Sequence, residues 1–272
     1  MNHFGAFVFL VLFFAISGSA NASTEKLAMR TADGLTFDVM LSKAETPKGT
    51  VIYVTGLGGD GNQIQKLSAE FNSNNFHLVT FDRDEPPCDG FKCFATVGGR
   101  VPSGQPIYAD GEISALDHIV SNEISSVIEF VTNSEWHASA PNLFIIGGSY
   151  GAWITLQTTV AAEFSELIDG VVLLSPSVAP HKSTGKYAKE LIRFNEINGG
   201  LKNKPVLAIG SDNDELFPGA TTKDSVDFLA TNLIEARVQT ILEDSGKHAK
   251  KLLLDSTAIR SQIINWLVEQ TP

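Results

Sequence analysis

The sequence predicts an α/β fold in which helices cover both faces of a mostly parallel β-sheet. Short β-branched runs alternate along the chain with longer stretches whose apolar residues recur every three or four positions. No internal repeat, low-complexity tract or linker interrupts this alternation after residue 22. Residues 23–272 also have a length that a single α/β domain commonly reaches. We therefore expect one domain that spans residues 23–272.

Residues 1–22 have the features of a secretory signal peptide. An apolar run from Phe4 to Ile16 is followed by Ala20-Asn21-Ala22, an A-x-A pattern after which signal peptidases cut. The run is shorter than the roughly 20 apolar residues that a membrane-spanning helix needs. We expect the protein to be exported, to the periplasm or to the extracellular space, and to have no stable membrane anchor.

The expected sheet has eight strands. The first two are joined by Ala32-Asp33-Gly34, a turn-forming triplet, and are therefore predicted to form a hairpin. The others are short apolar runs bounded by Gly, Pro or Asp. The predicted strands cover residues 27–31, 35–41, 50–54, 77–81, 142–147, 170–174, 205–210 and 237–242.

Helical patterns lie between these runs, at residues 62–72, 112–132, 150–164, 225–235 and 256–268. Strands that alternate with helices give a parallel sheet covered on both faces. The loops at the carboxyl ends of such strands carry the chemistry, because helix N-termini and backbone N–H groups converge there. Residues 175–204 are enough for a short cap segment only, and residues 82–111 are expected to form the opposite wall of the site.

The charge balance argues against a nucleic-acid partner. The chain has 20 basic and 31 acidic residues, which gives a formal net charge of −11. Such a surface repels phosphate backbones and anionic lipid. His77, His118, His137 and His181 are scattered without metal-ligand spacing. We expect neither a metal nor an organic cofactor, and the sequence leaves the oligomeric state open.

The two cysteines, Cys88 and Cys93, are predicted to form a local disulfide. In an exported protein, two cysteines this close in one loop are natural partners. So small a ring contributes only roughly 2 kcal/mol through chain entropy, and its expected role is to stiffen the loop. The alternatives are two free thiols or half of a zinc site, and the second is poor because the sequence has no further cysteine pair.

A candidate nucleophile follows the predicted strand 142–147. The chain there reads Gly147-Gly148-Ser149-Tyr150-Gly151, which fits G-x-S-x-G, and a helical pattern opens directly afterwards. Glycines are needed because the turn from strand to helix is sharp, and a side chain two positions from the serine would clash. The plain alternative is a glycine-rich turn with an exposed serine. The position between a strand and a helix favours Ser149 as a nucleophile.

A serine hydroxyl needs a base to take its proton and an acid to orient that base. The turn after strand 205–210 contains Asp212 and Asp214, and the turn after strand 237–242 leads to His248. No other histidine follows those aspartates. Taken singly, these residues could be turn or cap residues and a surface histidine. Their joint order along the chain favours a catalytic triad.

With these motifs the chain resembles the α/β-hydrolase superfamily over essentially the whole of residues 23–272. The serine turn, the acidic turn after a later strand and Gly246-Lys247-His248 ahead of the last helix all match that family. Members often carry the acid four residues before a proline. The resemblance therefore assigns the acid to Asp214, which precedes Pro218 by four positions, and Asp212 remains the alternative.

The resemblance also implies an oxyanion hole made of two backbone N–H groups. One belongs to the residue after the nucleophile, here Tyr150. The other lies in the loop after the third strand, which reads Thr55-Gly56-Leu57-Gly58-Gly59, and the match assigns it to Leu57. The chain departs from the family by having Thr55 where histidine is frequent, which puts the support of this loop in doubt but not its backbone donor.

These expectations describe a serine hydrolase in which Ser149 attacks a carbonyl carbon. The same triad serves esters, thioesters and peptides, because specificity depends on loops outside the motif. The short cap favours an open site for a small or exposed acyl group, and hence a carboxylester hydrolase. Two alternatives remain. One is a peptidase similar to the small serine aminopeptidases, with a pocket acid for the substrate amine, and the other is a noncatalytic binding protein on the same fold. The expected partner is thus a small-molecule or peptide substrate.

Overall fold

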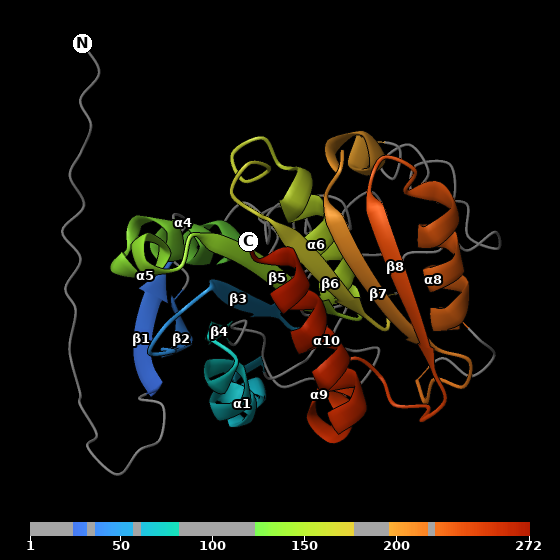
Figure 1. Cartoon of the computed structure of the whole chain (residues 1–272), viewed down its shortest axis with the longest axis horizontal. Coiled ribbons are helices and arrows are strands. Elements are labelled where there is room, and N and C mark those ends of the chain that lie inside the picture. The colour runs from blue at the N-terminus through green and yellow to red at the C-terminus, as the bar shows by residue number, and fades with distance from the viewer. Residues whose placement is uncertain (1–23, 32–35, 57–60, 82–122, 177–195, 217–220) are drawn as a thin grey trace.

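The computed structural model describes residues 24–31, 36–56, 61–81, 123–176, 196–216 and 221–272. These residues form one eight-stranded sheet in the order β1-β2-β4-β3-β5-β6-β7-β8 (Figure 1). Every predicted strand is found, with its ends displaced by a few residues at most. The strands are β1 (Thr24–Arg30), β2 (Thr36–Ser42), β3 (Gly49–Val54), β4 (Phe76–Phe81), β5 (Asn142–Gly148), β6 (Gly170–Leu174), β7 (Pro205–Ser211) and β8 (Arg237–Glu243).

The antiparallel part of the sheet is confined to one end. β1 pairs with β2, and β2 pairs with β4, in antiparallel register. From β4 onward, through β3, β5, β6, β7 and β8, every neighbouring pair is parallel. The prediction of a mostly parallel, eight-stranded sheet is confirmed. The parallel strands all end at the same side of the sheet, which we call the carboxyl edge.

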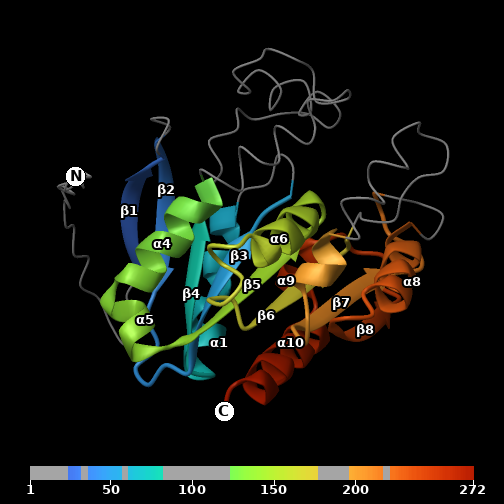
Figure 2. The same ribbon diagram turned by 90° about the horizontal axis from the view of Figure 1, so that it is seen from above.

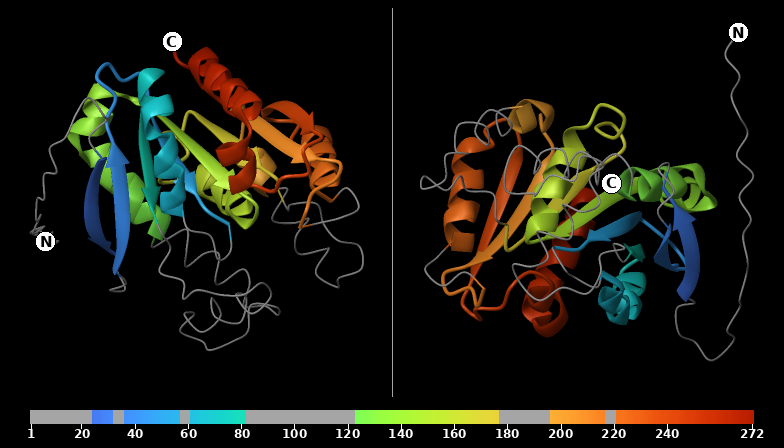
Figure 3. Two further views of the ribbon diagram at one scale, coloured as in Figure 1. Left: turned by 90° about the horizontal axis from the view of Figure 1, so that it is seen from below. Right: turned by 180° about the vertical axis from the view of Figure 1, so that it is seen from behind.

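Helices cover both faces of the sheet, as predicted (Figures 2 and 3). One face packs against α4 (Ser125–Asn133), α5 (Glu135–Ser139), α6 (Tyr150–Val160) and α8 (Thr221–Asn232). The other packs against the 3-10 helix η1 (Gly61–Leu67) and the α-helices α1 (Ser68–Ser73), α9 (Lys250–Asp255) and α10 (Thr257–Gln270). The sheet therefore separates two hydrophobic cores.

The central strands are buried on both faces, which explains their unbroken apolar sequences. In β3, Ile52 and Val54 pack into the core under α4 and α6, whereas Val51 and Tyr53 pack into the core under α1 and α9. All six residues of β3 and all five of β6 are buried. Such strands have no polar face to alternate with the apolar one. Because they are packed on both faces, these strands hold the loops at their carboxyl ends in place.

The helices differ from the prediction in detail. The stretch predicted as a helix over 62–72 begins as the 3-10 helix η1, and α5 and α9 are short helices that the sequence pattern does not predict. The helix predicted over 150–164 ends earlier, at Val160, and the next residue, Ala161, has an extended backbone conformation. Just before that end, the hydroxyls of Thr158 and Thr159 bond to carbonyls four residues earlier, a contact that mildly destabilises helices.

Several predictions concern residues outside the described ranges. They include the signal peptide, Leu57, both cysteines, all of the loop 82–111, the helical stretch 112–122 and residues 177–195 of the cap segment. Within the described ranges, none of the helices has the length and the hydrophobicity to cross a membrane.

Candidate active site

The candidate nucleophile lies at the carboxyl edge, where β5 ends and α6 begins. Ser149 is the residue just before α6, and its backbone angles are φ 56° and ψ −120°. A non-glycine residue in this region is strained, and such strain is typical of a serine held in a sharp strand-to-helix turn. The Ser149 N–H donates to the carbonyl oxygen of Leu174 at 2.8 Å. The turn is thus fixed to the neighbouring strand, β6.

The glycine at position 151 is required by close packing. A Cβ atom on Gly151 would lie 2.5 Å from the carbonyl oxygen of Val54 and 2.6 Å from that of Thr55. Both oxygens belong to the main chain at the end of β3, so neither can turn aside. A Cβ on Gly147 would likewise overlap the main chain of Gly151. The first turn of α6 therefore rests directly against β3.

Asp214 and His248 form a buried pair at the same edge. Asp214 lies in the turn after β7 and is 1% exposed, and His248 precedes α9 and is 6% exposed. The Nδ1 atom of His248 is 2.7 Å from Oδ2 of Asp214. The other carboxylate oxygen, Oδ1, accepts the N–H of Leu216 at 2.9 Å. A carboxylate can only accept, so Nδ1 carries the proton and Nε2 is the basic nitrogen of the ring.

The two turns that carry this pair are bonded to each other. The N–H of Glu215 donates to the carbonyl oxygen of Gly246 at 2.7 Å. Gly246 has φ 70°, in the left-handed region, and a Cβ there would lie 2.6 Å from the carbonyl oxygen of Asn213. The glycine two residues before His248 thus allows the acid turn and the histidine turn to touch. Asp212, the alternative acid, is exposed and is not the aspartate that contacts His248.

The serine turn and the histidine turn are also in contact. A Cβ on Gly148 would lie 3.3 Å from Cβ of Ala249, the residue after His248. It would also lie 2.9 Å from the phenol oxygen of Tyr53, which is fully buried beneath the turn. Burial raises the pKa of this phenol above its ordinary value, which keeps it neutral. The structure thus brings the segments 147–151, 211–216 and 246–249 together at one edge of the sheet.

Solved structures with the same architecture include esterases, a lipase and a dienelactone hydrolase. An esterase of Pyrococcus furiosus is 14% identical and covers 95% of this chain and 99% of its own, with a TM-score of 0.63. A lipase in its open form covers 92% of this chain and 98% of its own, with 12% identity and a TM-score of 0.65. An esterase of Rhizomucor miehei covers 94% of this chain and 84% of its own, with 13% identity and a TM-score of 0.59.

The chain adopts the α/β-hydrolase fold. The resemblance that the motifs indicated is therefore confirmed at the level of the fold. No family model matches the sequence, and no curated protein matches it significantly. With sequence identities below 20%, the likeness concerns the architecture, and the roles of individual residues rest on the local geometry.

Of the two residues predicted to form the oxyanion hole, the structure describes one. Tyr150, one predicted donor, is the first residue of α6. Leu57, the other, lies outside the described residues, but Gly56 just before it is described. A Cβ on Gly56 would be 3.0 Å from Cβ of Ser149 and 3.6 Å from its hydroxyl oxygen. The loop after β3 thus begins beside Ser149, where a second oxyanion donor would have to lie.

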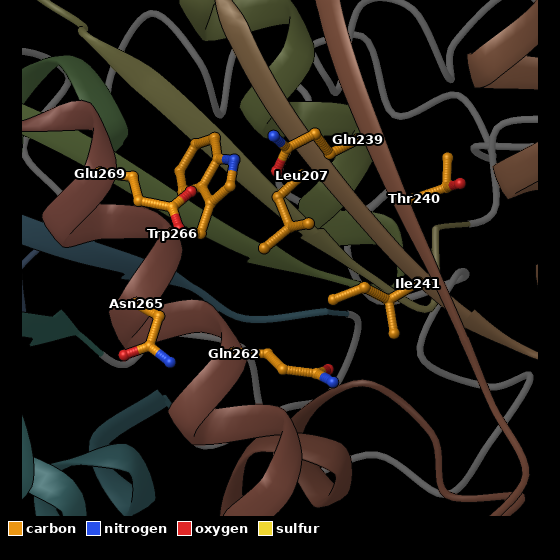
Figure 4. Close-up of a pocket in the computed structure, with 8 residues that line it drawn as sticks. All are labelled: Leu207, Gln239, Thr240, Ile241, Gln262, Asn265, Trp266 and Glu269. Atoms are coloured by element: carbon orange, nitrogen blue, oxygen red, sulfur yellow. The ribbon is translucent and has the colours of Figure 1, made fainter.

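A groove on the α10 face is separate from these residues. It is lined by residues of β7, β8 and α10, which include the apolar side chains of Trp266 and Leu207 and the polar side chains of Gln239, Gln262 and Glu269 (Figure 4). None of the residues that line it belongs to the serine, acid or histidine turns. The groove therefore lies between α10 and strands β7 and β8 rather than at the carboxyl edge.

Two features of the site have no signature in the sequence. One is the backbone of Ala249, which has φ 43° although it is not a glycine. The other is Ser175, whose buried hydroxyl contacts that residue. Among the described residues, no group of three or more His, Cys, Asp or Glu side chains is arranged to hold a metal ion.

Proposed function

We propose that this protein is a serine hydrolase that cleaves carboxylic esters through an acyl-enzyme on Ser149. The observation that carries the proposal is the buried 2.7 Å hydrogen bond between Asp214 and His248, beside a strained serine at the carboxyl edge. Serine is a weak nucleophile unless a base takes its proton, and the base must be held in one tautomer. The Asp214 carboxylate supplies this restraint.

The proposed reaction has two halves. In the first, Ser149 Oγ attacks the ester carbonyl carbon while Nε2 of His248 takes the hydroxyl proton. The tetrahedral intermediate collapses, and the alcohol leaves with the proton from His248. In the second, Nε2 of His248 takes a proton from a water that attacks the acyl carbon. The bond from that carbon to Ser149 Oγ then breaks, His248 returns the proton to Oγ, and the carboxylic acid leaves. The backbone N–H groups of Leu57 and Tyr150 would stabilise the oxyanion in both halves.

The preference for esters over peptides rests on two supports. The solved structures with this architecture include several esterases and a lipase. The chain between β6 and β7, residues 175–204, is too short for a large separate lid. The catalytic unit in this proposal is residues 23–272, and its substrate is a small molecule.

The nucleophile is tested with a fluorophosphonate probe, which labels activated serines covalently. The wild-type protein should be labelled, and Ser149→Ala should abolish labelling and lower turnover by about 10⁴-fold or more, because triad residues act as a unit. Ser261→Ala, which removes an exposed hydroxyl on α10, is the matched control and should be labelled like the wild type. Labelling of Ser149→Ala at the wild-type rate would refute the proposal.

The reaction class is tested with a panel of substrates. Acyl esters with short and long chains are compared with aminoacyl amides of the same acyl groups. We expect kcat/KM to be highest for an ester. Faster cleavage of the aminoacyl amides would assign the protein to the aminopeptidase-like alternative. A protein that binds these compounds without any turnover would be a noncatalytic binding protein.

Export is a second part of the proposal. The first strand, β1, begins at Thr24, so cleavage after Ala22 would remove no element of the described fold. Expression of the full chain in a bacterial host should release protein that begins at Ser23 into the periplasm or medium, as measured by mass spectrometry. Ala22→Asp, which disrupts the A-x-A pattern, should block the cleavage. Cytoplasmic protein with an intact N-terminus would contradict export.

The predicted disulfide depends on that compartment. Because export takes the protein into an oxidising environment, Cys88 should be joined to Cys93 in the mature protein. Alkylation before and after reduction, followed by mass spectrometry, measures this directly. Two thiols that can be alkylated in the folded, exported protein would show that the bond is absent.

A further inference from the structure

We propose that Ser175 is a positioning residue for the base: its buried hydroxyl anchors the backbone beside His248 and so holds the imidazole toward Ser149. This inference rests on the proposed function, because a positioned base matters only in a catalytic site. Ser175 is not part of the motif that identifies the nucleophile, the acid or the base.

Ser175 lies at the centre of the carboxyl edge. It is the residue after β6, between the strand that leads to Ser149 and the strand that leads to Asp214. It is completely buried, and its N–H donates to the carbonyl oxygen of Ile209 in β7 at 2.7 Å. The hydroxyl is therefore carried by a main chain that the sheet itself fixes.

The hydroxyl makes one contact that bears on the base. Ser175 Oγ accepts the N–H of Ala249 at 2.8 Å, across 74 positions of the sequence. Ala249 follows His248 directly and is the residue before α9, with φ 43° and ψ −108°. A non-glycine residue in this region is strained and persists only where surrounding contacts hold it. The bond from Ser175 is such a contact.

The same short segment also holds the nucleophile. Leu174, the residue before Ser175, accepts the N–H of Ser149 at 2.8 Å. Two consecutive residues thus bond to the turn of the nucleophile and to the turn of the base. Their contacts fix the separation between those turns, while the carboxylate of Asp214 fixes the rotation of the ring. A base in this arrangement has both its main chain and its side chain restrained.

The backbone of Ser175 supports a role for the hydroxyl itself. Its φ is 45°, in the left-handed region that glycine adopts most readily. Glycine would relieve that strain, but it has no side-chain acceptor for the N–H of Ala249. Ser175 thus has a backbone conformation that is unfavourable for a non-glycine residue, together with a hydrogen bond that neither glycine nor alanine can make.

The test compares Ser175→Ala with Ser42→Ala. Ser42 is equally buried, and its Oγ likewise accepts one N–H, from Asn72 at 2.7 Å, but it lies at the opposite edge of the sheet. Ser175→Ala should lower kcat and the rate of fluorophosphonate labelling about 10- to 100-fold, with KM changed less than about threefold, because small displacements of a catalytic group cost rate. Ser42→Ala should keep the wild-type rates even where it lowers the melting temperature.

A second variant, Ser175→Gly, separates the effect of losing the hydroxyl from the effect of the backbone strain at this position. Ser175→Gly also lacks the acceptor but relaxes the backbone, so it should fold at least as readily as Ser175→Ala and show the same loss of rate. The low-field proton resonance of the His248 Nδ1–H bond should shift or broaden in both variants and stay unchanged in Ser42→Ala. Wild-type kinetics and an unchanged resonance in Ser175→Gly would overturn the inference.

The two proposals can fail separately. If the wild-type protein is not labelled, or if Ser149→Ala is labelled like the wild type, the proposed hydrolase is wrong. If the wild type is labelled at Ser149 and both Ser175 variants keep its labelling rate, the hydrolase stands and the positioning role of Ser175 is wrong.

Discussion

Two aspartates in the turn after β7 differ sharply in their surroundings, although they are only two positions apart. Asp214 is buried and accepts a hydrogen bond from His248 and another from Leu216. Asp212 is exposed to solvent. A carboxylate sets the tautomer of a histidine only when it contacts the ring. The two residues therefore make a matched pair for mutation.

Asp214→Asn should lower kcat by about 10³- to 10⁴-fold, because an amide at this position stabilises the wrong tautomer of His248 and cannot stabilise the imidazolium. Asp212→Asn should change kcat less than about threefold, in line with an exposed substitution. Steady-state kinetics on one ester measures both. A larger loss for Asp212→Asn would transfer the role to that residue.

The phenol oxygen of Tyr53 is a buried polar atom that makes no hydrogen bond with the described residues. A buried polar group without a partner costs stability. Tyr53→Phe should therefore raise the free energy of unfolding by about 1 kcal/mol, whereas Ser42→Ala, which removes a bonded hydroxyl, should lower it by about 1 kcal/mol. Urea denaturation compares them. A destabilised Tyr53→Phe would show that the phenol has a bonding partner.

At the scale of elements, the contact between α6 and β3 determines the geometry of the serine turn. Gly151→Ala would press a methyl group against the carbonyl oxygens of Val54 and Thr55. We expect it to lower the free energy of unfolding by about 1–3 kcal/mol, as overpacking does. Activity should fall as well, because the end of β3 leads into the predicted oxyanion loop.

The matched control is Gly199→Ala. Gly199 lies in the helical segment 196–200, and a Cβ there would meet no atom within 4 Å. Alanine is the better helix former, so this variant should raise the free energy of unfolding by up to about 1 kcal/mol. Thermal and urea denaturation of both variants provide the test. Equal effects of the two substitutions would refute the close contact.

The elements differ in how far the sequence predicts them. β3 and β6 are predictable because both of their faces are buried, which leaves an unbroken apolar run. The turn that carries Ser149 is predictable because G-x-S-x-G is a local pattern, and those of Asp214 and His248 are predictable because they follow it in the order of a triad. Ser175 and Ala249 are not, because their contact joins residues 74 positions apart and uses a main-chain N–H that every residue type but proline has. The helix α5 was missed because it has only five residues, too few to show a period.

At the scale of the whole molecule, His77 links the stability of the fold to pH. Burial, with a smaller contribution from Lys43, lowers the pKa of His77 to about 4. Its Nδ1 accepts the N–H of Ala44 at 3.0 Å, and its ring lies against Trp136. The charge of Lys43 is itself paired with Glu135 at 2.8 Å. The folded protein therefore holds His77 neutral.

Stability should consequently fall in acid. The unfolded chain protonates His77 near pH 6.5, while the folded chain resists protonation to about pH 4. The contribution of His77 is present above pH 6.5 and is lost as the pH falls through this interval, by up to about 3 kcal/mol. Urea denaturation at pH 7 and pH 4.5 measures the loss, and His77→Gln should reduce it. The same loss in both proteins would contradict this role.

The strand order has a consequence for the order in which the site can assemble. After β3, the sheet grows outward in the order of the chain, through β5, β6, β7 and β8. A chain that emerges with its N-terminus first can add each of these strands to an edge that already exists. Ser149 comes with β5, the acid with β7 and the histidine only after β8. A chain whose strands have been added only as far as β7 therefore has the serine without its proposed base, and the proposed site is complete only when β8 and residue 248 after it are in place.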